Sequence, residues 1–291
     1  MPNKTVLISG VKGQLGQKVR EAMLKHRDLN VIGVDLDEMD IVSRREVEAK
    51  LQEIQPEVLI NCSAYTNVDQ AENEKEMALK VNQRGPQVLA EKCKLFGTLL
   101  IHVSTDYVFS GESFRPYNEN DPTRPVNFYG ETKALGEEAI QQIYNNSIIL
   151  RTAWLYSEHG KNFVKTMLRL GSERKKLGVI DDQVGTPTYA GDLANAIEVI
   201  TLHFLEGEDF ARGIYHFANE GVCSWFDFAL KIQQMAGNSV MVNPIPTADY
   251  PTPAKRPHYS VLDKRKIKNQ FHITIPHWEQ SLKKCIDILK G

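Results

Sequence analysis

The strongest constraint on the fold is a glycine-rich turn that lies directly between an apolar run and an amphipathic segment. Residues 5–9 form a short β-branched run, residues 10–16 read G-x-x-G-x-x-G, and residues 15–25 have helical periodicity. Glycine permits positive φ and close backbone approach, so this pattern predicts a strand, a tight turn and a helix whose N-terminus can bind a diphosphate. A plain tight turn without a ligand is the alternative.

The alternation of strand-like and helix-like segments continues through the N-terminal half. Further apolar, strand-like runs lie at residues 30–34, 57–61, 98–103 and 147–150. Helical periodicity covers residues 74–94 and 129–144. Strands separated by helices of this length predict a parallel sheet with right-handed crossovers and helices on both faces. The predicted fold is α/β, a doubly wound parallel sheet of the Rossmann type.

The pattern beyond Arg151 is less regular. Helices are predicted at residues 162–170, 193–204 and 225–235, and strands at 177–180 and 214–217. A proline-rich stretch at residues 244–257 indicates either an ordered connection around a pocket or a mobile loop.

Composition and charge exclude several classes of function. The 291 residues include 35 Lys plus Arg and 37 Asp plus Glu, so no net positive field exists to hold a nucleic acid or an anionic membrane. Residues 1–4 do not resemble the start of a signal peptide, and no apolar run approaches the roughly 18 residues of a membrane helix. The scattered cysteines, which lack metal-ligand spacing, are Cys62, Cys93, Cys223 and Cys285. We therefore expect a cytoplasmic protein with reduced thiols.

Tyr129 and Lys133 are the first candidate catalytic pair, because their i, i+4 spacing places them on one helix face. A free tyrosine has a pKa of about 10, so acid–base work near neutral pH needs a nearby positive charge, which Lys133 can supply. Thr105 follows the strand at 98–103, at the sheet edge where ligands bind, and its hydroxyl can bond a substrate carbonyl. The alternatives are a solvated helix face for the pair and a backbone cap for Thr105.

Asp35 ends the second strand about 20 residues after the last glycine of the turn, where an acid binds the ribose hydroxyls of a dinucleotide. An exposed carboxylate at a strand end is the alternative. Asp35 would repel a 2′-phosphate and so favours NADH, while Lys12 in the turn can offset that repulsion and admit NADPH.

Together these residues resemble the extended short-chain dehydrogenase/reductase family. Five segments resemble the dTDP-4-dehydrorhamnose reductases within it, in the same order and spacing, at residues 104–109, 127–133, 151–156, 182–188 and 250–257. The resemblance covers essentially the whole chain. It implies that residues 1–151 form an NAD(P)-binding Rossmann domain. It also implies that residues 152–291 form mainly a smaller substrate-binding lobe, with segments near 177–217 returning to the main sheet.

The resemblance also implies a set of binding residues. The implied cofactor-binding residues are Gly10, Gly13, Gln14, Leu15, Gly16, Asp35, Asp40, Ile41, Ala64, Tyr65, Thr66, Val103, Tyr129 and Lys133. The implied substrate-binding residues are Thr105, Asp106, Tyr129, Lys133 and Trp154. A buried aromatic that only packs is the alternative for Trp154. Three further residues are either contacts of the nucleotide diphosphate or loop-bracing groups, namely Asn162, Gln183 and Arg256.

The implied activity is reduction of the C4 ketone of dTDP-4-dehydro-β-L-rhamnose by NADPH or NADH, with Tyr129, Lys133 and Thr105 as the catalytic residues. The alternatives are another nucleotide-sugar reductase or epimerase of the superfamily, and a non-catalytic NADP-binding regulatory subunit. The expected partner is the dTDP-sugar alone, in a monomer or weak homodimer. The resemblance also leaves Mg²⁺ open as a cofactor, because some relatives are bridged by Mg²⁺ held on carboxylates. The matching positions here are Lys18 and Gly191, so we expect the bridging carboxylates to be absent.

Overall fold

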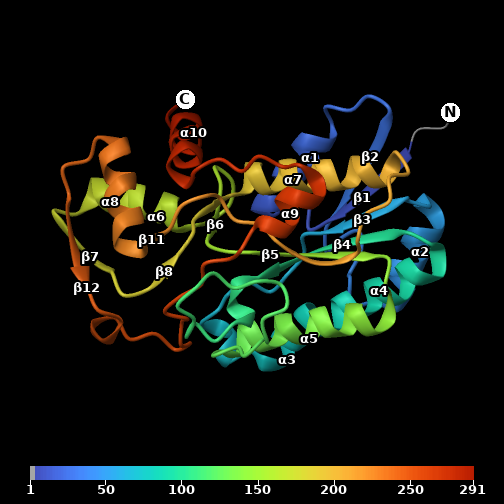
Figure 1. The fold of residues 1–291 in the computed structure, drawn as a ribbon, viewed down its shortest axis with the longest axis horizontal. Coiled ribbons are helices and arrows are strands. Elements are labelled where there is room, and N and C mark those ends of the chain that lie inside the picture. The colour runs from blue at the N-terminus through green and yellow to red at the C-terminus, as the bar shows by residue number, and fades with distance from the viewer. Residues whose placement is uncertain (1–3) are drawn as a thin grey trace.

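A sheet of six parallel strands runs through the centre of the protein, as the computed structural model describes it for residues 4–291 (Figure 1). The spatial order is β2-β1-β3-β4-β5-β10. The bounds are β1 Lys4–Ser9, β2 Leu29–Val34, β3 Val58–Asn61, β4 Leu99–Thr105, β5 Ser147–Thr152 and β10 Gly213–His216. The predicted doubly wound parallel sheet is confirmed. The strand order reverses between β1 and β3, so the crevice where such folds bind ligands lies at the ends of these two strands.

Helices cover both faces of this sheet. One face carries α1 (Gln14–Met23), α7 (Ala190–Leu205) and α9 (Arg265–Phe271). The other carries α2 (Arg44–Ile54), α4 (Gly85–Phe96) and α5 (Phe128–Ile143). Side chains alternate between the two faces along each strand, and the strands are apolar nearly throughout because both faces are covered. In β1, for example, Val6 and Ile8 enter one core and Leu7 enters the other.

A smaller lobe packs beside the sheet around its own apolar core (Figure 1). Its helices are α6 (Phe163–Glu173), α8 (Trp225–Ala236) and α10 (Trp278–Lys290). Its strand pairs are β7 (Lys176–Ile180) with β12 (Met241–Ile245), β6 (Leu155–Tyr156) with β9 (Thr188–Tyr189), and β8 (Val184–Gly185) with β11 (Cys223–Ser224). Within the proline-rich stretch, β12 and the 3₁₀ turn η4 (Thr247–Asp249) are ordered.

The segment that we expected to return to the main sheet, near residues 177–217, divides between the two parts. Its last strand, β10, pairs with β5 in the main sheet, and α7 packs against α1. Its first strand, β7, instead pairs with β12 in the lobe. The domain border at residues 151 and 152 stays a prediction.

The prediction of one continuous helix at residues 74–94 is wrong, because a π turn interrupts it. The chain forms α3 (Lys75–Leu79), a π turn named η2 (Lys80–Arg84) and then α4. The π turn carries Asn82, which is buried. Such turns are frequent at functional sites. The short 3₁₀ turn η1 (Gln70–Glu72) precedes α3.

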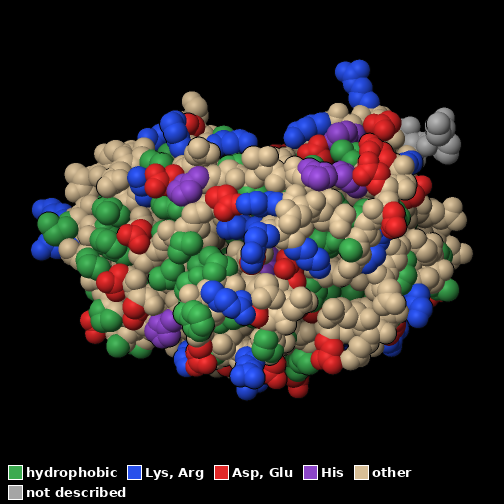
Figure 2. Space-filling model, viewed as in Figure 1, with side chains coloured by type: hydrophobic (Ala, Val, Ile, Leu, Met, Phe, Trp, Pro, Cys, Tyr) green, Lys and Arg blue, Asp and Glu red, His purple; other side chains and the backbone are tan. Residues whose placement is uncertain are grey.

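The surface has mixed charge. Figure 2 shows acidic and basic side chains interspersed over the visible face, without one extended patch of either sign. Within residues 4–291, every helix is too short or too polar to cross a membrane.

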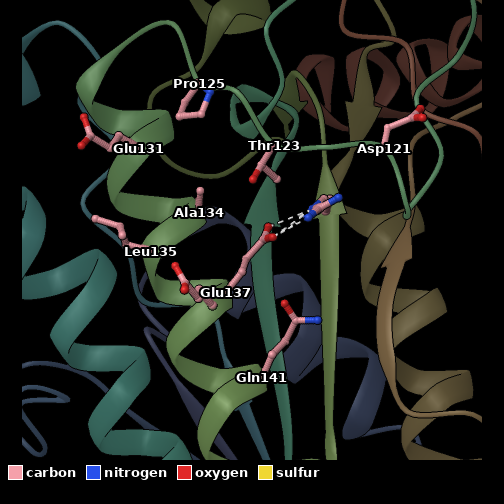
Figure 3. A pocket seen from close by; sticks show the side chains of 10 residues that line it. Asp121, Thr123, Pro125, Glu131, Ala134, Leu135, Glu137 and Gln141 are labelled. Atoms are coloured by element: carbon pink, nitrogen blue, oxygen red, sulfur yellow. Dashed lines mark hydrogen bonds and ion pairs between the residues drawn. The ribbon is translucent and has the colours of Figure 1, made fainter.

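A buried ion pair attaches α5 to the central sheet. The Arg151 guanidinium on β5 donates to the Glu137 carboxylate on α5, with distances of 2.6 Å from Nη2 to Oε2 and 3.0 Å from Nε to Oε1. Each side chain is only 3% exposed. Figure 3 shows Glu137 reaching from α5 toward the strand, in the wall of a cavity of about 420 Å³. The Phe109 ring lies 5.0 Å from the guanidinium carbon and adds a cation–π contact.

We predict that Arg151→Met destabilises the fold by about 3–5 kcal/mol, because it leaves the Glu137 carboxylate buried without a counter-ion. The double variant Glu137→Gln, Arg151→Met should recover most of this loss, since no uncompensated charge remains. Urea denaturation of the three proteins measures the difference. Equal losses in the single and double variants would show that packing, and not charge, is responsible.

Candidate active site

The first component of the site is a cavity of about 330 Å³ at the reversal point of the sheet. Seven of the predicted cofactor-binding residues line it, namely Gly10, Gly13, Asp35, Asp40, Ile41, Ala64 and Tyr65. Leu36, Met39, Cys62, Ser63 and Val81 complete the lining and were not singled out from the sequence. Thr66 is exposed and lies outside this lining. The cavity therefore gathers the ends of β1, β2 and β3, as the fold class predicts.

Close packing explains why glycine is needed in the turn after β1. Gly10 has φ +72°, and a Cβ there would lie 2.7 Å from the backbone nitrogen of Ser63. A Cβ on Gly16 would collide with the Gly10 carbonyl oxygen, so α1 can start close under the turn only without a side chain. The cap of α1 is Gly13, which offers no side-chain acceptor, so first-turn N–H groups stay available to a ligand. Leu15 is buried in the core, which leaves only its backbone for such a contact.

Asp35 directly follows β2, and backbone N–H groups hold its carboxylate. Oδ2 accepts from the Lys12 nitrogen at 3.0 Å, and Oδ1 accepts from the Leu36 nitrogen at 2.9 Å. The Lys12 ammonium lies 2.6 Å from Oδ2 of Asp37, and this bond raises the pKa of Lys12 and lowers that of Asp37. Asp35 and Lys12, which the sequence analysis connected with the choice between NADH and NADPH, thus lie side by side.

Asn82 links the cofactor cavity to α5 and was missed by the sequence analysis. Its Oδ1 accepts from the Tyr65 nitrogen at 2.9 Å, and its Nδ2 donates to the Tyr65 carbonyl oxygen at 3.0 Å. Nδ2 also donates to the Thr132 hydroxyl at 3.1 Å. One buried amide therefore holds the loop after β3 against the helix that carries Tyr129 and Lys133. No local sequence signal marks the π turn that turns Asn82 inward.

The structure brings the three predicted catalytic residues together. Thr105 is the last residue of β4, and Tyr129 and Lys133 lie on the first two turns of α5, which Asn127 caps by accepting from the Gly130 nitrogen at 2.8 Å. Burial raises the pKa of Tyr129 to about 12, although a hydrogen bond with the Thr105 hydroxyl acts in the opposite direction. The Tyr107 ring packs edge-on against Tyr129, with 5.6 Å between centroids. Tyr129 is therefore a neutral phenol that can donate a proton.

Lys133 is 2% exposed. Its ammonium group donates to the Val103 carbonyl oxygen at 2.8 Å and lies 3.3 Å from Nε2 of His102. Burial lowers the pKa of Lys133 to about 8, while the Glu137 carboxylate acts to raise it. Lys133 is thus poised to exchange a proton near neutral pH.

Asp106 follows Thr105 in the 3₁₀ turn η3 (Asp106–Val108) and is 1% exposed. Its Oδ1 accepts from the Thr105 hydroxyl at 3.0 Å. Oδ2 makes no hydrogen bond to any residue within 4–291. Burial raises the pKa of Asp106 to about 6. A buried acceptor of this kind suits the hydroxyl of a polar ligand.

A second cavity, of about 530 Å³, lies mainly in the smaller lobe and reaches the predicted catalytic residues through Tyr107, whose ring packs against Tyr129. Tyr107, Gln183 and Arg256 line it, together with Phe163 and Trp225 from the lobe. Arg256 makes a bidentate ion pair with Asp69, with two N–O distances of 2.7 Å. Gln183 donates to the Thr247 hydroxyl at 3.0 Å.

Two other residues expected near the substrate have clear packing roles. Trp154 lies outside the lining of the second cavity and stacks on Trp225, with ring centroids 3.6 Å apart and planes within 10°. Its φ of +46° is unusual for a bulky residue. Asn162 caps α6 by accepting from the Lys165 nitrogen at 3.1 Å, and it also approaches Gln14, with 3.4 Å from Nδ2 to Oε1.

The region around Lys18 contains acidic groups that the sequence analysis did not single out. Glu21, Glu158 and His159 form the one group of three close metal-ligating side chains within residues 4–291. The Lys18 ammonium lies 2.7 Å from Glu158 Oε1 and also pairs with Glu21. The single positive charge of Lys18 thus offsets part of the negative charge of these two carboxylates. Gly191, the other position that matches a carboxylate of the Mg²⁺-bridged relatives, is the second residue of α7, where a Cβ would press on the Tyr189 ring.

Comparisons with known proteins agree with this geometry. The family described as the RmlD substrate binding domain matches residues 4–290. The chain belongs to that family. A dTDP-4-dehydrorhamnose reductase of Aggregatibacter actinomycetemcomitans is 44% identical over 284 residues, which cover 96% of this chain and 97% of the relative.

Two solved members of the family are similar throughout. A dTDP-4-dehydrorhamnose reductase of Clostridium acetobutylicum is 39% identical with a TM-score of 0.91, over 99% of this chain and 100% of that one. The enzyme of Bacillus anthracis, solved in complex with NADP, is 38% identical with a TM-score of 0.93, over 98% of this chain and 99% of that one. The resemblance drawn from the sequence motifs is confirmed.

We predict that Lys133→Met raises the free energy of unfolding near pH 7 by roughly 1–3 kcal/mol, because a buried ammonium is removed. The folded pKa of about 8 lies below the ordinary lysine value of 10.5. The unfolded chain therefore binds more protons between these values, and wild-type stability rises with pH across that window. The advantage of the variant should be full below pH 8 and shrink toward pH 10.5. Urea titrations at pH 7 and 9.5 measure it, and an equal difference at both would contradict the prediction.

Proposed function

We propose that this chain reduces the C4 ketone of dTDP-4-dehydro-β-L-rhamnose to dTDP-β-L-rhamnose, the last step of dTDP-L-rhamnose biosynthesis. The observation that carries the proposal is the convergence of Thr105, Tyr129 and Lys133 at the end of β4. Tyr65 of the first cavity and Tyr107 of the second cavity both pack in the cluster around Tyr129. The reductase names of relatives at 44% and 39% identity support the same activity.

The first cavity fits NADPH or NADH, which supplies the hydride when bound. The turn at residues 10–16 offers backbone N–H groups of α1 to the diphosphate, because no side chain caps that helix. Asp35 would accept from the adenosine ribose, and Asp40 and Ile41 would hold the adenine. By the family resemblance, Ala64, Tyr65, Thr66 and Val103 would hold the nicotinamide end. The NADP complex of the Bacillus anthracis relative supports this choice of cofactor.

Proton transfer is the task of Tyr129. As hydride reaches the carbonyl carbon, negative charge builds on the ketone oxygen, and hydrogen bonds from Thr105 and Tyr129 stabilise it. Tyr129 then donates its proton to that oxygen. The charge of Lys133 stabilises the tyrosinate that remains, and the same group holds the ribose hydroxyls beside the nicotinamide. Burial raises the pKa of Tyr129 and so keeps the phenol protonated until negative charge develops on the ketone oxygen.

The second cavity suits the nucleotide end of the sugar substrate. Its aromatic residues Phe163 and Trp225 provide flat apolar surfaces for a base, and Trp154 supports Trp225 from behind. Gln183 and Arg256 offer donors to a diphosphate. Asp106, whose Oδ2 is buried and unbonded within residues 4–291, accepts from a sugar hydroxyl.

The proposal also covers the location, the partner and the oligomeric state of the protein. A cytoplasmic location is consistent with four free thiols, of which burial raises the pKa of Cys62 to about 12. The dTDP-sugar is the proposed partner, in a monomer or weak homodimer that uses residues 1–151 for the cofactor and mainly residues 152–291 for the sugar. No Mg²⁺ bridge is needed at Lys18, because its ammonium already pairs with Glu21 and Glu158.

The deciding experiment follows the absorbance of reduced nicotinamide, with the 4-keto sugar nucleotide generated by the two preceding reactions. Loss of absorbance equal to the dTDP-rhamnose formed supports the proposal. An epimerase would recycle its cofactor, so product would form without net loss. A regulatory subunit would bind the cofactor but turn over no ketosugar.

We predict that Tyr129→Phe lowers kcat by about 10²- to 10⁴-fold, because the proton donor is lost. Cofactor affinity should change little, since the ring and its edge contact with Tyr107 remain. Steady-state kinetics and cofactor titration measure both quantities. Tyr144→Phe, at the far end of α5, is the matched control and should retain wild-type turnover. Near wild-type turnover in the Tyr129 variant would refute the assignment.

We predict that Lys12→Ala raises KM for NADPH by roughly fivefold and leaves KM for NADH nearly unchanged, because only NADPH presents a 2′-phosphate to the ammonium. Asp37→Asn is the matched variant, since it releases Lys12 from its ion pair and should lower KM for NADPH. Parallel kinetics with the two cofactors test both. Equal effects on both cofactors would place the 2′-phosphate elsewhere.

A further inference from the structure

A row of buried polar side chains crosses the sheet directly under Lys133. Ser9, Asn61 and His102 are register partners on the adjacent strands β1, β3 and β4. Each lies two residues beyond a leucine of the core beneath α4 and α5, so all three point to that face. None of the three is more than 1% exposed. Such groups persist in a core only when they are hydrogen-bonded.

The direction of each hydrogen bond in this row follows from a backbone donor. The Ser63 nitrogen donates to Asn61 Oδ1 at 3.0 Å, and the Ser9 hydroxyl donates to the same oxygen at 2.8 Å. A backbone N–H can only donate, so this orientation of the Asn61 amide is fixed. Its Nδ2 then faces Nδ1 of His102 at 2.9 Å and donates to it. Nδ1 of His102 is therefore an acceptor and carries no proton.

The neutral imidazole must then carry its hydrogen on Nε2. Burial lowers the pKa of His102 well below its ordinary value, and the charge of Lys133 lowers it further, so the ring stays neutral. Nε2 lies 3.3 Å from the Lys133 nitrogen. An ammonium has no lone pair to accept this hydrogen, whereas a neutral amine does.

We propose that His102, oriented by Asn61, is a positioning residue that favours the neutral amine form of Lys133. The effect on catalysis rests on the proposed function, in which Lys133 lies beside the tyrosinate formed from Tyr129. A lysine held in this way is a stronger acid. It gives up a proton from Nζ to the tyrosinate more readily, and the neutral amine that remains accepts a hydrogen bond from the Nε2–H group of His102, which keeps its proton.

The other charged and titratable groups around Lys133 are either paired with another residue or neutral. Glu137, one turn further along α5, favours the ammonium, but its carboxylate is paired with Arg151 of β5. Tyr129, one turn earlier on the same helix, is neutral until it gives up its proton. From β4, Lys133 meets only the Val103 carbonyl oxygen and His102 within residues 4–291. The imidazole of His102 is thus the side-chain contact that favours the neutral form of Lys133 over the ammonium form.

The kinetic test is His102→Gln, because glutamine places its amide where Nε2 lies and can turn an oxygen acceptor toward the ammonium. The pKa of Lys133 should rise, so the basic limb of the pH profile of kcat/KM should move up by about one pH unit. The plateau of kcat should fall several-fold, because a weaker acid protonates the tyrosinate more slowly. An unshifted basic limb would overturn the proposal.

The matched control is Ser9→Ala. It removes one donor from the same row but leaves the Ser63 nitrogen to orient Asn61, so the direction of the remaining bonds is unchanged. Its stability should fall while its pH profile matches wild type. If the basic limb of Ser9→Ala shifts as far as that of His102→Gln, packing alone determines the pKa of Lys133, and the proposal is overturned.

A spectroscopic test separates this inference from the activity. The ¹⁵N shifts of the His102 ring in the free wild-type protein should show the tautomer with hydrogen on Nε2. In Asn61→Asp, a carboxylate accepts from Nδ1, and the ring should switch to the other tautomer. Hydrogen on Nδ1 in wild type refutes the proposal even if the enzyme is an active reductase. The expected tautomer with no ketosugar turnover would refute the proposed function alone.

Discussion

Parallel pairing of β1, β3, β4 and β5 in one register brings the polar ends of these strands beneath the first turns of α5. The helix cannot approach that edge unless its own polar groups find partners, because a buried charge without one is very costly. Glu137 meets Arg151 and Lys133 meets Val103, and these contacts set the height and rotation of α5. The position of Tyr129 relative to Thr105 follows from them.

The parts of the site that could be predicted from the sequence are those encoded locally. The glycine turn is recognisable because positions 10 and 16 have no room for a side chain. The shared helix face of Tyr129 and Lys133 follows from helical periodicity. The partners of these residues could not be predicted, since Asn82 acts from a π turn and His102 sits in a strand that reads as apolar. The pairing of Glu137 with Arg151 depends on which strand lies under α5. Trp154 was expected near the substrate, but a stack on Trp225 from a distant helix accounts for its position.

Burial shifts the three titratable groups at the end of β4 in different ways. It raises the pKa of Tyr129 and Asp106, because their charged forms are anions, and lowers that of Lys133, because its charged form is a cation. All three shifts favour neutral groups in the free protein. A ketone entering this site meets a phenol, a hydroxyl and a weakly held proton, which is a suitable environment for charge that appears only during the reaction.

The stack of Trp154 on Trp225 also provides an intrinsic spectroscopic signal for changes at the second cavity. Two of the three tryptophans lie face to face at 3.6 Å, and one of them lines the second cavity. Indole rings this close share their electronic transitions, so the pair acts as a single chromophore whose near-ultraviolet circular dichroism depends on the angle between the planes. The third tryptophan, Trp278, is buried on α10 and contributes a steady background. A nucleotide that binds against Trp225, or a movement of α8 relative to the segment after β5, should therefore change the near-ultraviolet circular dichroism without any added label.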